Sequence, residues 1–312
     1  MSRAMSQAIG SPPRYGRNPY SQTIRLIRKK KWAYVFIAPD ILLFLCFVLV
    51  PVARSFILAF QEFRLAGNIW VGLDNFKYVL TDPVFGAAMR NTALYTLVMV
   101  PQNIIVALIL ASILRHLSER AQTLFRAAYY LPGVASAVVI SMVWKWIYDP
   151  NFGLFNFLLS KVGLGPYPWL TSPRTSLFSI MLMGILAAPG GFIILYLAAM
   201  KKIPRELYEV ADIDGATPIR KWWNITLPLL KPTTLYLAIV STIGSFQIFT
   251  AAYVMTQGGP GYSTTTVVYL IYNTAFRDFE FGLASAQAII LFLVIVAVSI
   301  FNFRRFSTDI QY

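Results

Sequence analysis

The chain has 312 residues, 57% hydrophobic and only 13% charged, which indicates a membrane protein because soluble domains average roughly 25% charged residues. A single cysteine, Cys46, excludes an internal disulfide, and a single histidine, His116, leaves too few ligands for a histidine–cysteine metal cluster. The net charge of +14 suits either nucleic-acid binding or a charge bias among membrane loops, and the positions of the basic residues distinguish the two.

Residues 1–30 are rich in Pro, Gly, Ser and Arg, a composition typical of a disordered segment. The apolar run that follows is long and has no small-residue cleavage site, which argues against a cleaved signal peptide. We therefore expect a disordered cytoplasmic tail over 1–30, a transmembrane domain over 31–306 and a short C-terminal tail over 307–312.

Six apolar segments are long enough to cross a bilayer, because a hydrocarbon core of about 30 Å needs about 20 helical residues. The second, fourth, fifth and sixth of them contain no Lys, Arg, Asp or Glu. The sequence therefore predicts an all-α, polytopic membrane protein with six transmembrane helices and both termini on one side. The segments lie at about 34–58, 91–114, 126–147, 176–200, 233–256 and 282–303.

The basic residues predict which side of the membrane holds the termini. Of the 27 Lys and Arg residues, 19 lie in the tail to Lys31, in 115–126, in 201–231 and after the last span. By the positive-inside rule, both termini and the 201–231 segment are cytoplasmic. Because these charges are spread over separate loops, they indicate orientation and not a nucleic-acid surface.

Two positions inside the spans are candidates for a role in transport. Asp40 lies one or two turns inside the first span, where a carboxylate either acts in transport or sits at headgroup level beside the basic tail. Pro189, Gly190 and Gly191 interrupt the middle of the fourth span. Such a break either lines a substrate cavity or is a packing kink, and the sequence leaves both open.

The fifth span carries neutral hydrogen-bonding side chains and no charge. Ser241 and Ser245, and more loosely Gln247, share one helical face. This face either packs against another helix or lines a path for a neutral polar solute. Neutral donors and acceptors beside aromatic rings suit a sugar better than an ion.

The polar segment 201–232, between the fourth and fifth spans, predicts a first short helix. Pro204 suits the first helical position, and Glu206 and Glu209 favour the positive end of the helix dipole. Gly215 is expected to end this helix. Its apolar face would consist of Leu207, Val210 and Ala211.

A second short helix is expected to begin at Thr217 as N-cap and Pro218 as first helical residue, and to be broken at Leu227-Pro228. Its side chains facing the membrane surface would be Ile219, Trp222, Trp223 and Thr226. Helices this short are marginal in water, so the two-helix elbow needs a docking surface, or else it only connects two spans.

At these residues the sequence resembles a known family. The segment reads Glu209-Val210-Ala211-x-x-Asp214-Gly215-Ala216 and then Ile225-Thr226-Leu227-Pro228. It resembles the EAA loop of permease subunits of binding-protein-dependent ABC importers, including the 13-residue separation of Gly215 and Pro228, although Val210 replaces the motif's Ala. Two further runs resemble the carbohydrate-uptake branch, in particular the larger maltose-system and the glycerol-phosphate-system permeases. They are Tyr148-Asp149-Pro150-x-x-Gly153-x-x-Asn156, and Gln257-Gly258-Gly259-Pro260-Gly261 with Tyr272 and Phe276.

The resemblance implies that residues 206–215 form a coupling helix set in a cleft of a cytoplasmic ATPase. The coupling residues would be Glu206, Glu209, Ala211, Asp214, Gly215, Ile225, Leu227 and Pro228. It also implies that Ser241, Ser245 and Gln247 line a sugar site, to which the broken fourth span would add Gly190.

The implied function is ATP-driven uptake of a sugar or oligosaccharide across a bacterial cytoplasmic membrane, with a polyol such as glycerol-phosphate as the alternative cargo. The implied partners are a second permease subunit, two ATPase subunits that bind ATP and Mg²⁺, and an external solute-binding protein. The sequence has no G-x-x-x-x-G-K-[ST] phosphate loop, so it is not expected to be an enzyme. A secondary transporter is disfavoured because four spans lack ionisable residues.

Overall fold

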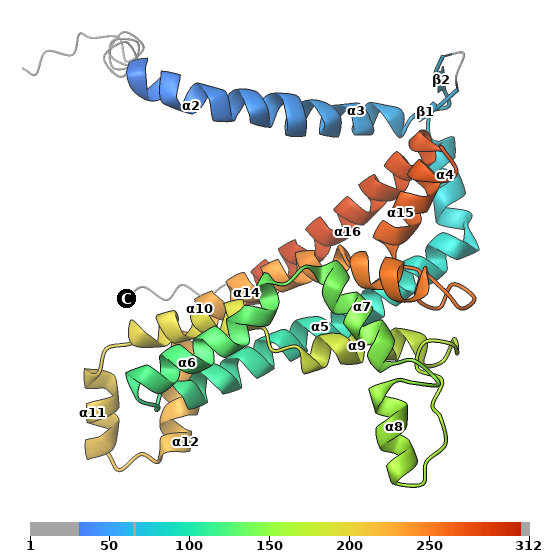
Figure 1. Ribbon diagram of the computed structural model, residues 1–312. Coiled ribbons are helices and arrows are strands. Elements are labelled where there is room, and N and C mark those ends of the chain that lie inside the picture. Colours follow the sequence, from blue (N-terminus) through green and yellow to red (C-terminus); the bar gives the residue numbers. More distant parts are fainter. Residues whose placement is uncertain (1–30, 65–66, 307–312) are drawn as a thin grey trace, which may run out of the picture. The chain divides into compact units, whose positions relative to one another are not determined.

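The computed structural model describes residues 31–64 and 67–306, and the predicted tails 1–30 and 307–312 lie outside the described residues. Two compact units divide the chain between Ser55 and Phe56. Figure 1 shows that the described residues are predominantly helical, as the sequence predicts.

One continuous apolar helix accounts for the first predicted span. It consists of α2 (Lys31–Phe44), a π-helical turn η1 (Leu45–Leu49) and α3 (Val50–Leu58). Pro51 lacks the backbone N–H that an α-helical turn would need, which accounts for the wider turn before it. Every side chain from 32 to 54 is exposed within its own unit, and most of them are apolar.

The second unit is built around α5 (Pro83–Leu114) and α16 (Phe281–Phe306), each long and apolar enough to cross a membrane. The α5 helix begins eight residues before the predicted span. The Asp82 carboxylate caps it by accepting hydrogen bonds from the backbone N–H groups of Val84 and Phe85 at 3.0 and 3.2 Å. Arg90 therefore lies inside α5, although the hydropathy pattern alone predicted that the span begins just after it, at residue 91.

The other predicted spans are broken helices. The third contains a 92° bend between α6 (Glu119–Tyr130), continued by η2 (Leu131–Val134), and α7 (Ala137–Ile147). The fourth contains the predicted interruption, a 41° bend between α9 (Ser176–Leu186) and α10 (Gly190–Lys201). If each bent pair is one span, length and composition allow up to six crossings.

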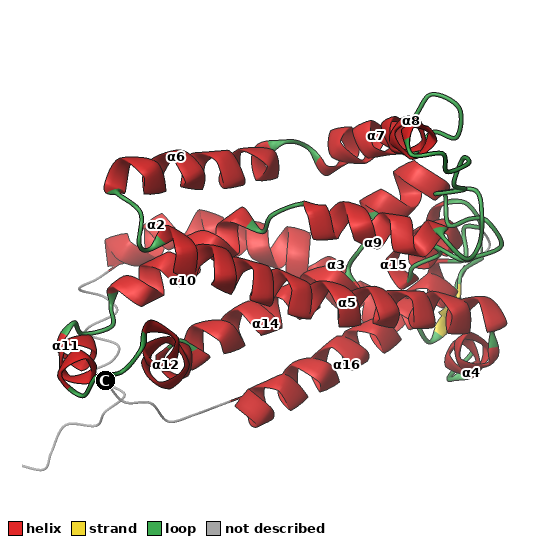
Figure 2. Ribbon diagram, turned by 90° about the horizontal axis from the view of Figure 1, so that it is seen from below, coloured by secondary structure: helices red, strands yellow, loops and turns green. Residues whose placement is uncertain are grey.

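The predicted fifth span, 233–256, is wrong as a single helix. Helix α14 (Lys231–Phe246) stops at Gln247, and the chain becomes helical again only at Thr250, leading into a π-helical turn η4 (Ala252–Thr256). A short apolar helix, α15 (Val267–Phe276), follows and was not predicted. Helices α5, α10, α14 and α16 run side by side in Figure 2, with α14 packed on α5 and on α16.

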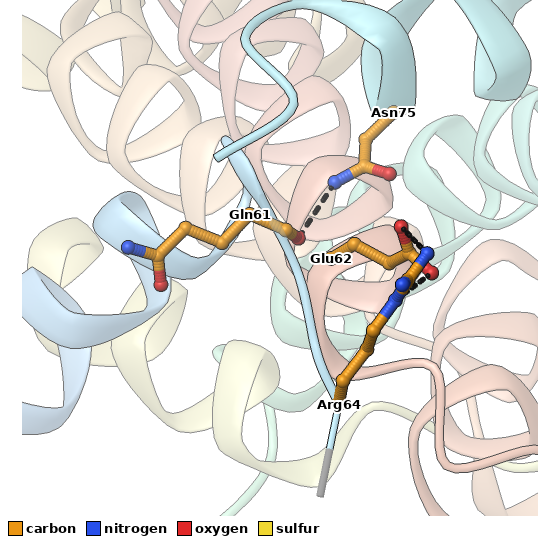
Figure 3. A network of polar contacts seen from close by, with 4 residues as sticks. All are labelled: Gln61, Glu62, Arg64 and Asn75. Atoms are coloured by element: carbon orange, nitrogen blue, oxygen red, sulfur yellow. Dashed lines mark hydrogen bonds and ion pairs between the residues drawn. The ribbon is translucent and has the colours of Figure 1, made fainter. Parts of the chain in front are cut away.

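A small strand pair, β1 (Gln61–Glu62) and β2 (Ile69–Trp70), precedes helix α4 (Asp74–Thr81). Asn75 Nδ2 donates to the carbonyl of Gln61 at 3.0 Å (Figure 3). It also donates to the carbonyl of Ala59 at 3.0 Å. The Arg64 guanidinium lies 2.8 Å from the Glu62 carboxylate, and its hydrogen bond lowers the pKa of that carboxyl. The Asn75 hydrogen bonds hold the start of the hairpin against α4.

Candidate functional site

The elbow between α10 and α14 forms the two short helices that the sequence predicts. Helix α11 runs over Glu206–Ile213, and Gly215 follows in a left-handed conformation with φ of +69°. Thr217 Oγ1 accepts a hydrogen bond from the backbone N–H of Arg220 at 3.3 Å and caps α12 (Pro218–Lys221). Figures 1 and 2 both place α11 and α12 at one end of the long helices and α8 (Leu154–Lys161) at the other.

Two predicted boundaries in the elbow are wrong. Pro204 lies two residues before α11, which begins at Glu206. The Leu227-Pro228 pair does not break the second helix, because a π-helical turn η3 (Trp222–Thr226) leads directly into α13 (Leu227–Leu229). The bend comes after Leu229, where the chain turns by 64° into α14.

Five side chains tie the elbow to the long helices, and three of them, Ser112, Arg115 and Tyr208, were not selected from the sequence. The Tyr208 hydroxyl makes hydrogen bonds with Thr226 Oγ1 and with an Arg115 Nη1 donor, both at 2.8 Å. Trp222 Nε1 donates to Ser112 Oγ at 2.9 Å. Arg115 and Ser112 belong to the end of α5, so the elbow is held by a polar network rather than by its backbone alone.

A surface ion pair also joins the two short helices. Lys221 Nζ lies 2.5 Å from Asp212 Oδ1, and the lysine side chain is 18% exposed against 62% for the carboxylate. An ion pair of this exposure contributes little stability. It bridges α11 and α12 across the turn at Gly215.

The predicted coupling residues divide into two groups. Ile225 and Leu227 pack against the core cluster formed by α5, α10 and α14, and Pro228 is half-buried beside them. The first helix instead turns its predicted residues outward: Glu206, Glu209, Asp214 and Gly215 are exposed and Ala211 is half-buried. The predicted residues of 206–215 therefore form a free surface, and Ile225, Leu227 and Pro228 fasten the elbow to the long helices.

Apolar side chains on α11 are left uncovered. Leu207 is 44% exposed, Val210 58% and Ile213 86%. The second helix is not a single membrane-facing surface as predicted, since Trp222 and Thr226 turn inward. An apolar and acidic surface on a short projecting helix is suited to a protein partner.

The predicted substrate-binding residues do not form one surface. Ser241 and Ser245 are 5% and 6% exposed, and Asn103 Nδ2 of α5 donates to Ser241 Oγ at 3.3 Å. Gln247 is exposed at the end of α14. Gly190 lies against the backbone of Tyr129 so closely that a Cβ would overlap the carbonyl. Within this unit, the two serines and Gly190 lie between helices and Gln247 has an exposed side chain, and a substrate-binding role for these residues stays a prediction.

Asp40 is exposed on α2, one residue after Pro39. The basic tail with which it was expected to pair lies outside the described residues. Its role in transport stays a prediction.

The first of the two flanking motifs is a compact hydrogen-bonded unit at the end opposite the elbow. The Asp149 carboxylate accepts hydrogen bonds from the backbone N–H groups of Asn151 and Phe152, both at 2.9 Å, which lowers the pKa of Asp149. Gly153 lies against the Asp149 carbonyl with no room for a Cβ. The Tyr148 hydroxyl donates to the carbonyl of Ser179 at 2.8 Å.

The second flanking motif is held in the same way. Gln257 and Gly258 both have positive φ, of 49° and 79°. The Tyr269 hydroxyl donates to the Gln257 carbonyl and Thr265 Oγ1 donates to the Gly258 carbonyl, at 2.8 and 2.9 Å. Asn91 of α5 donates to the Thr265 carbonyl at 3.0 Å. These hydrogen bonds fix the backbone at Gln257 and Gly258.

A family model described as the inner membrane component of binding-protein-dependent transport systems matches residues 103–310. The chain belongs to this family. It is 36% identical over 278 residues to the arabinooligosaccharides transport system permease AraP of Bacillus subtilis, covering 88% of each chain. It is 35% identical to the lactose transport system permease LacF of Rhizobium radiobacter, covering 86% of this chain and 92% of the relative.

A solved structure has the same fold. A chain from a bacterial ABC transporter for import of the acidic polysaccharide alginate superimposes with a TM-score of 0.82 at 24% identity, covering 92% of this chain and all of the other. The predicted resemblance to ABC importer permeases is confirmed by the family match. The protein is therefore a multi-pass permease subunit of the inner membrane and not itself an enzyme.

Proposed function

We propose that this permease forms half of the translocation pathway of an ATP-driven importer for a sugar or oligosaccharide. The relatives support this cargo: their names specify arabinooligosaccharides, lactose and, for a permease of Thermococcus litoralis that is 31% identical, trehalose and maltose. Neutral polar side chains on α14 and the absence of Lys and Arg from 176–200 and 233–256 fit an uncharged solute.

The proposed assembly contains a second permease subunit, two cytoplasmic ATPase subunits that hold ATP and Mg²⁺, and an external solute-binding protein. Each broken helix would count as one span, giving six, with both termini and the elbow in the cytoplasm. A solved alginate transporter of the same fold is described in complex with a sugar-bound periplasmic protein, which supports an external partner.

The free surface of α11 is the observation that carries the coupling role. It presents Glu206 and Glu209 beside uncovered Leu207 and Val210, while Tyr208, in the same helix, is tied to α5. A surface free on one side and anchored on the other transmits displacement as a rigid body. The ATPase cleft would supply basic groups for the two carboxylates and apolar contacts for the two aliphatic side chains.

Glu209→Lys tests this role by reversing one charge on the free surface. We expect uptake to be lost and the ATPase subunits to co-purify poorly, while the permease still inserts. Glu119→Lys, at an exposed glutamate in the first turn of α6, is the matched charge reversal and is expected to leave uptake intact. Normal uptake by Glu209→Lys would contradict the coupling role.

One relative supports a polar, charged glycoside as the alternative cargo. The sulfoquinovosyl glycerol transport permease SmoG of Agrobacterium fabrum is 32% identical over 279 residues. Glycerol-phosphate or another polyol derivative would be carried by the same mechanism. Competition of neutral oligosaccharides and of polyol phosphates against labelled uptake separates the two cargoes.

A further inference from the structure

A cavity of about 220 Å³ lies behind the elbow, between it and the end of α5. The α5 end and the residues just after it contribute Ser112, Arg115 and His116, and the elbow contributes Lys221, Trp222 and Thr226. Among the described residues that line it, none is Asp or Glu. The cavity is distinct from the free surface of α11, because it faces the helices and not the solvent side of the elbow.

The cations of this cavity are only partly neutralised. The Arg115 guanidinium lies 4.5 Å from the centre of the Tyr208 ring and donates to the Tyr208 hydroxyl, which is a neutral partner. No carboxylate among the described residues forms an ion pair with Arg115. Lys221 has Asp212, but that carboxylate is largely exposed. A half-buried arginine without an anion is unfavourable, so the site is suited to a negatively charged ligand.

The position of the cavity points to a phosphate group. Arg115 directly follows Leu114, the last residue of the apolar α5 helix, so it lies where the chain leaves the membrane interior. Guanidinium forks match phosphate oxygens in geometry, and basic pockets at helix ends on this surface bind anionic headgroups. The Thr226 hydroxyl adds a neutral hydrogen-bonding group to the same lining.

We propose that this cavity binds a phosphate group, supplied by an anionic lipid headgroup or by a soluble phosphate ester. A phosphate there would bridge Arg115 on one wall and Lys221 on the other, and so would add a third connection between α5 and the elbow. Binding of a phosphate group rests on the cavity lining, a lipid source rests also on the proposed topology, and an effect on transport rests on the proposed coupling function of the elbow.

The test uses the full-length permease, purified with the subunits it retains and reconstituted in two bilayers. One contains phosphatidylcholine only and the other an equal mixture with phosphatidylglycerol. We expect native mass spectrometry to show phosphatidylglycerol retained preferentially, and Arg115→Gln to weaken this retention by about tenfold. Lys221→Gln is expected to weaken it as well and provides a second variant if Arg115→Gln inserts poorly.

Two variants and one added anion separate the outcomes. Arg120→Gln removes an exposed arginine of α6 that does not line the cavity, and Asp212→Asn breaks the Lys221 ion pair but keeps both cations; both should retain the lipid. If inorganic phosphate raises the melting temperature of the permease in phosphatidylcholine alone, and Arg115→Gln abolishes this rise, the ligand is a soluble phosphate ester. Equal retention of both lipids with no response to phosphate, or equal loss in Arg120→Gln, would overturn the proposal.

Binding and coupling are read separately by including Glu209→Lys. This variant is expected to lose uptake and keep phosphatidylglycerol. If its uptake is normal, the coupling function fails while the phosphate-group site stands. If phosphatidylglycerol retention does not depend on Arg115, the site fails whatever the uptake result.

Discussion

Asn156 is expected to hold the segment between α7 and α9 in place, and its replacement by alanine should release that segment. The side chain is 6% exposed and uses its whole amide. Nδ2 donates to the carbonyls of Pro150 and Tyr167, both at 3.2 Å. Oδ1 accepts from the Tyr167 backbone N–H and from Trp169 Nε1, both at 3.0 Å.

The magnitude follows from these four bonds. Each contributes about 1 kcal/mol net, and the buried partners left without a hydrogen bond would add to the loss. Water can reach part of the site after truncation, so we take about 3 kcal/mol for Asn156→Ala. At 1.36 kcal/mol for each factor of ten, the population of the open segment should rise by roughly a hundredfold.

Hydrogen exchange of the membrane-embedded permease measures this directly. The Tyr167 amide should exchange roughly a hundredfold faster in Asn156→Ala, while amides in α5 keep their protection. Asn151→Ala is the control, since Asn151 is exposed in the same segment and, among the described residues, its side chain makes no hydrogen bond. Unchanged exchange at Tyr167, or an equal increase in Asn151→Ala, would refute the reasoning.

Two further predictions concern the pathway and the orientation. Gln247→Ala should lower sugar uptake about fivefold without loss of folded permease, because one exposed hydrogen-bonding group is removed. Ser241→Phe should instead reduce the yield of folded protein, because it overpacks the contact between α14 and α5. Normal uptake by Gln247→Ala would remove Gln247 from the pathway. In a Cys46→Ser background, an impermeant maleimide should label Ala216→Cys from the cytoplasm and Asn151→Cys from outside, and the reverse result would overturn the proposed topology.

The parts of the elbow that the sequence predicted depend on short-range chemistry. Gly215 takes the left-handed conformation after α11, and Thr217 caps α12 with its own hydroxyl. Each of these features is decided by one residue and its neighbours in the chain. The same is true of the interruption at Pro189, where a missing N–H and two glycines weaken one turn.

The parts that the sequence did not predict depend on residues distant in the chain. Trp222 looked like an interfacial anchor because nothing local identifies Ser112, 110 positions earlier, as its partner. Polar periodicity on α14 could not identify a partner for Ser241, and Asn103 of α5, 138 positions earlier, is that partner. Pro132 and Gly133 predict a kink in the third span, but nothing local predicts a bend as large as the 92° that follows the Leu131–Val134 turn.

The contacts of the elbow also determine which helices should move with it. Helix α13 continues into α14 through one bend, so a displacement of the elbow reaches α14 through the backbone. Tyr208 and Trp222 connect the elbow to α5 through side chains, and the Tyr196 hydroxyl of α10 donates to Thr234 Oγ1 of α14 at 2.9 Å. A push on α11 is therefore expected to shift α5, α10 and α14 as one body. The flexible points would then lie at the breaks beyond them, before Gly190 and after Phe246, where the backbone is not helical.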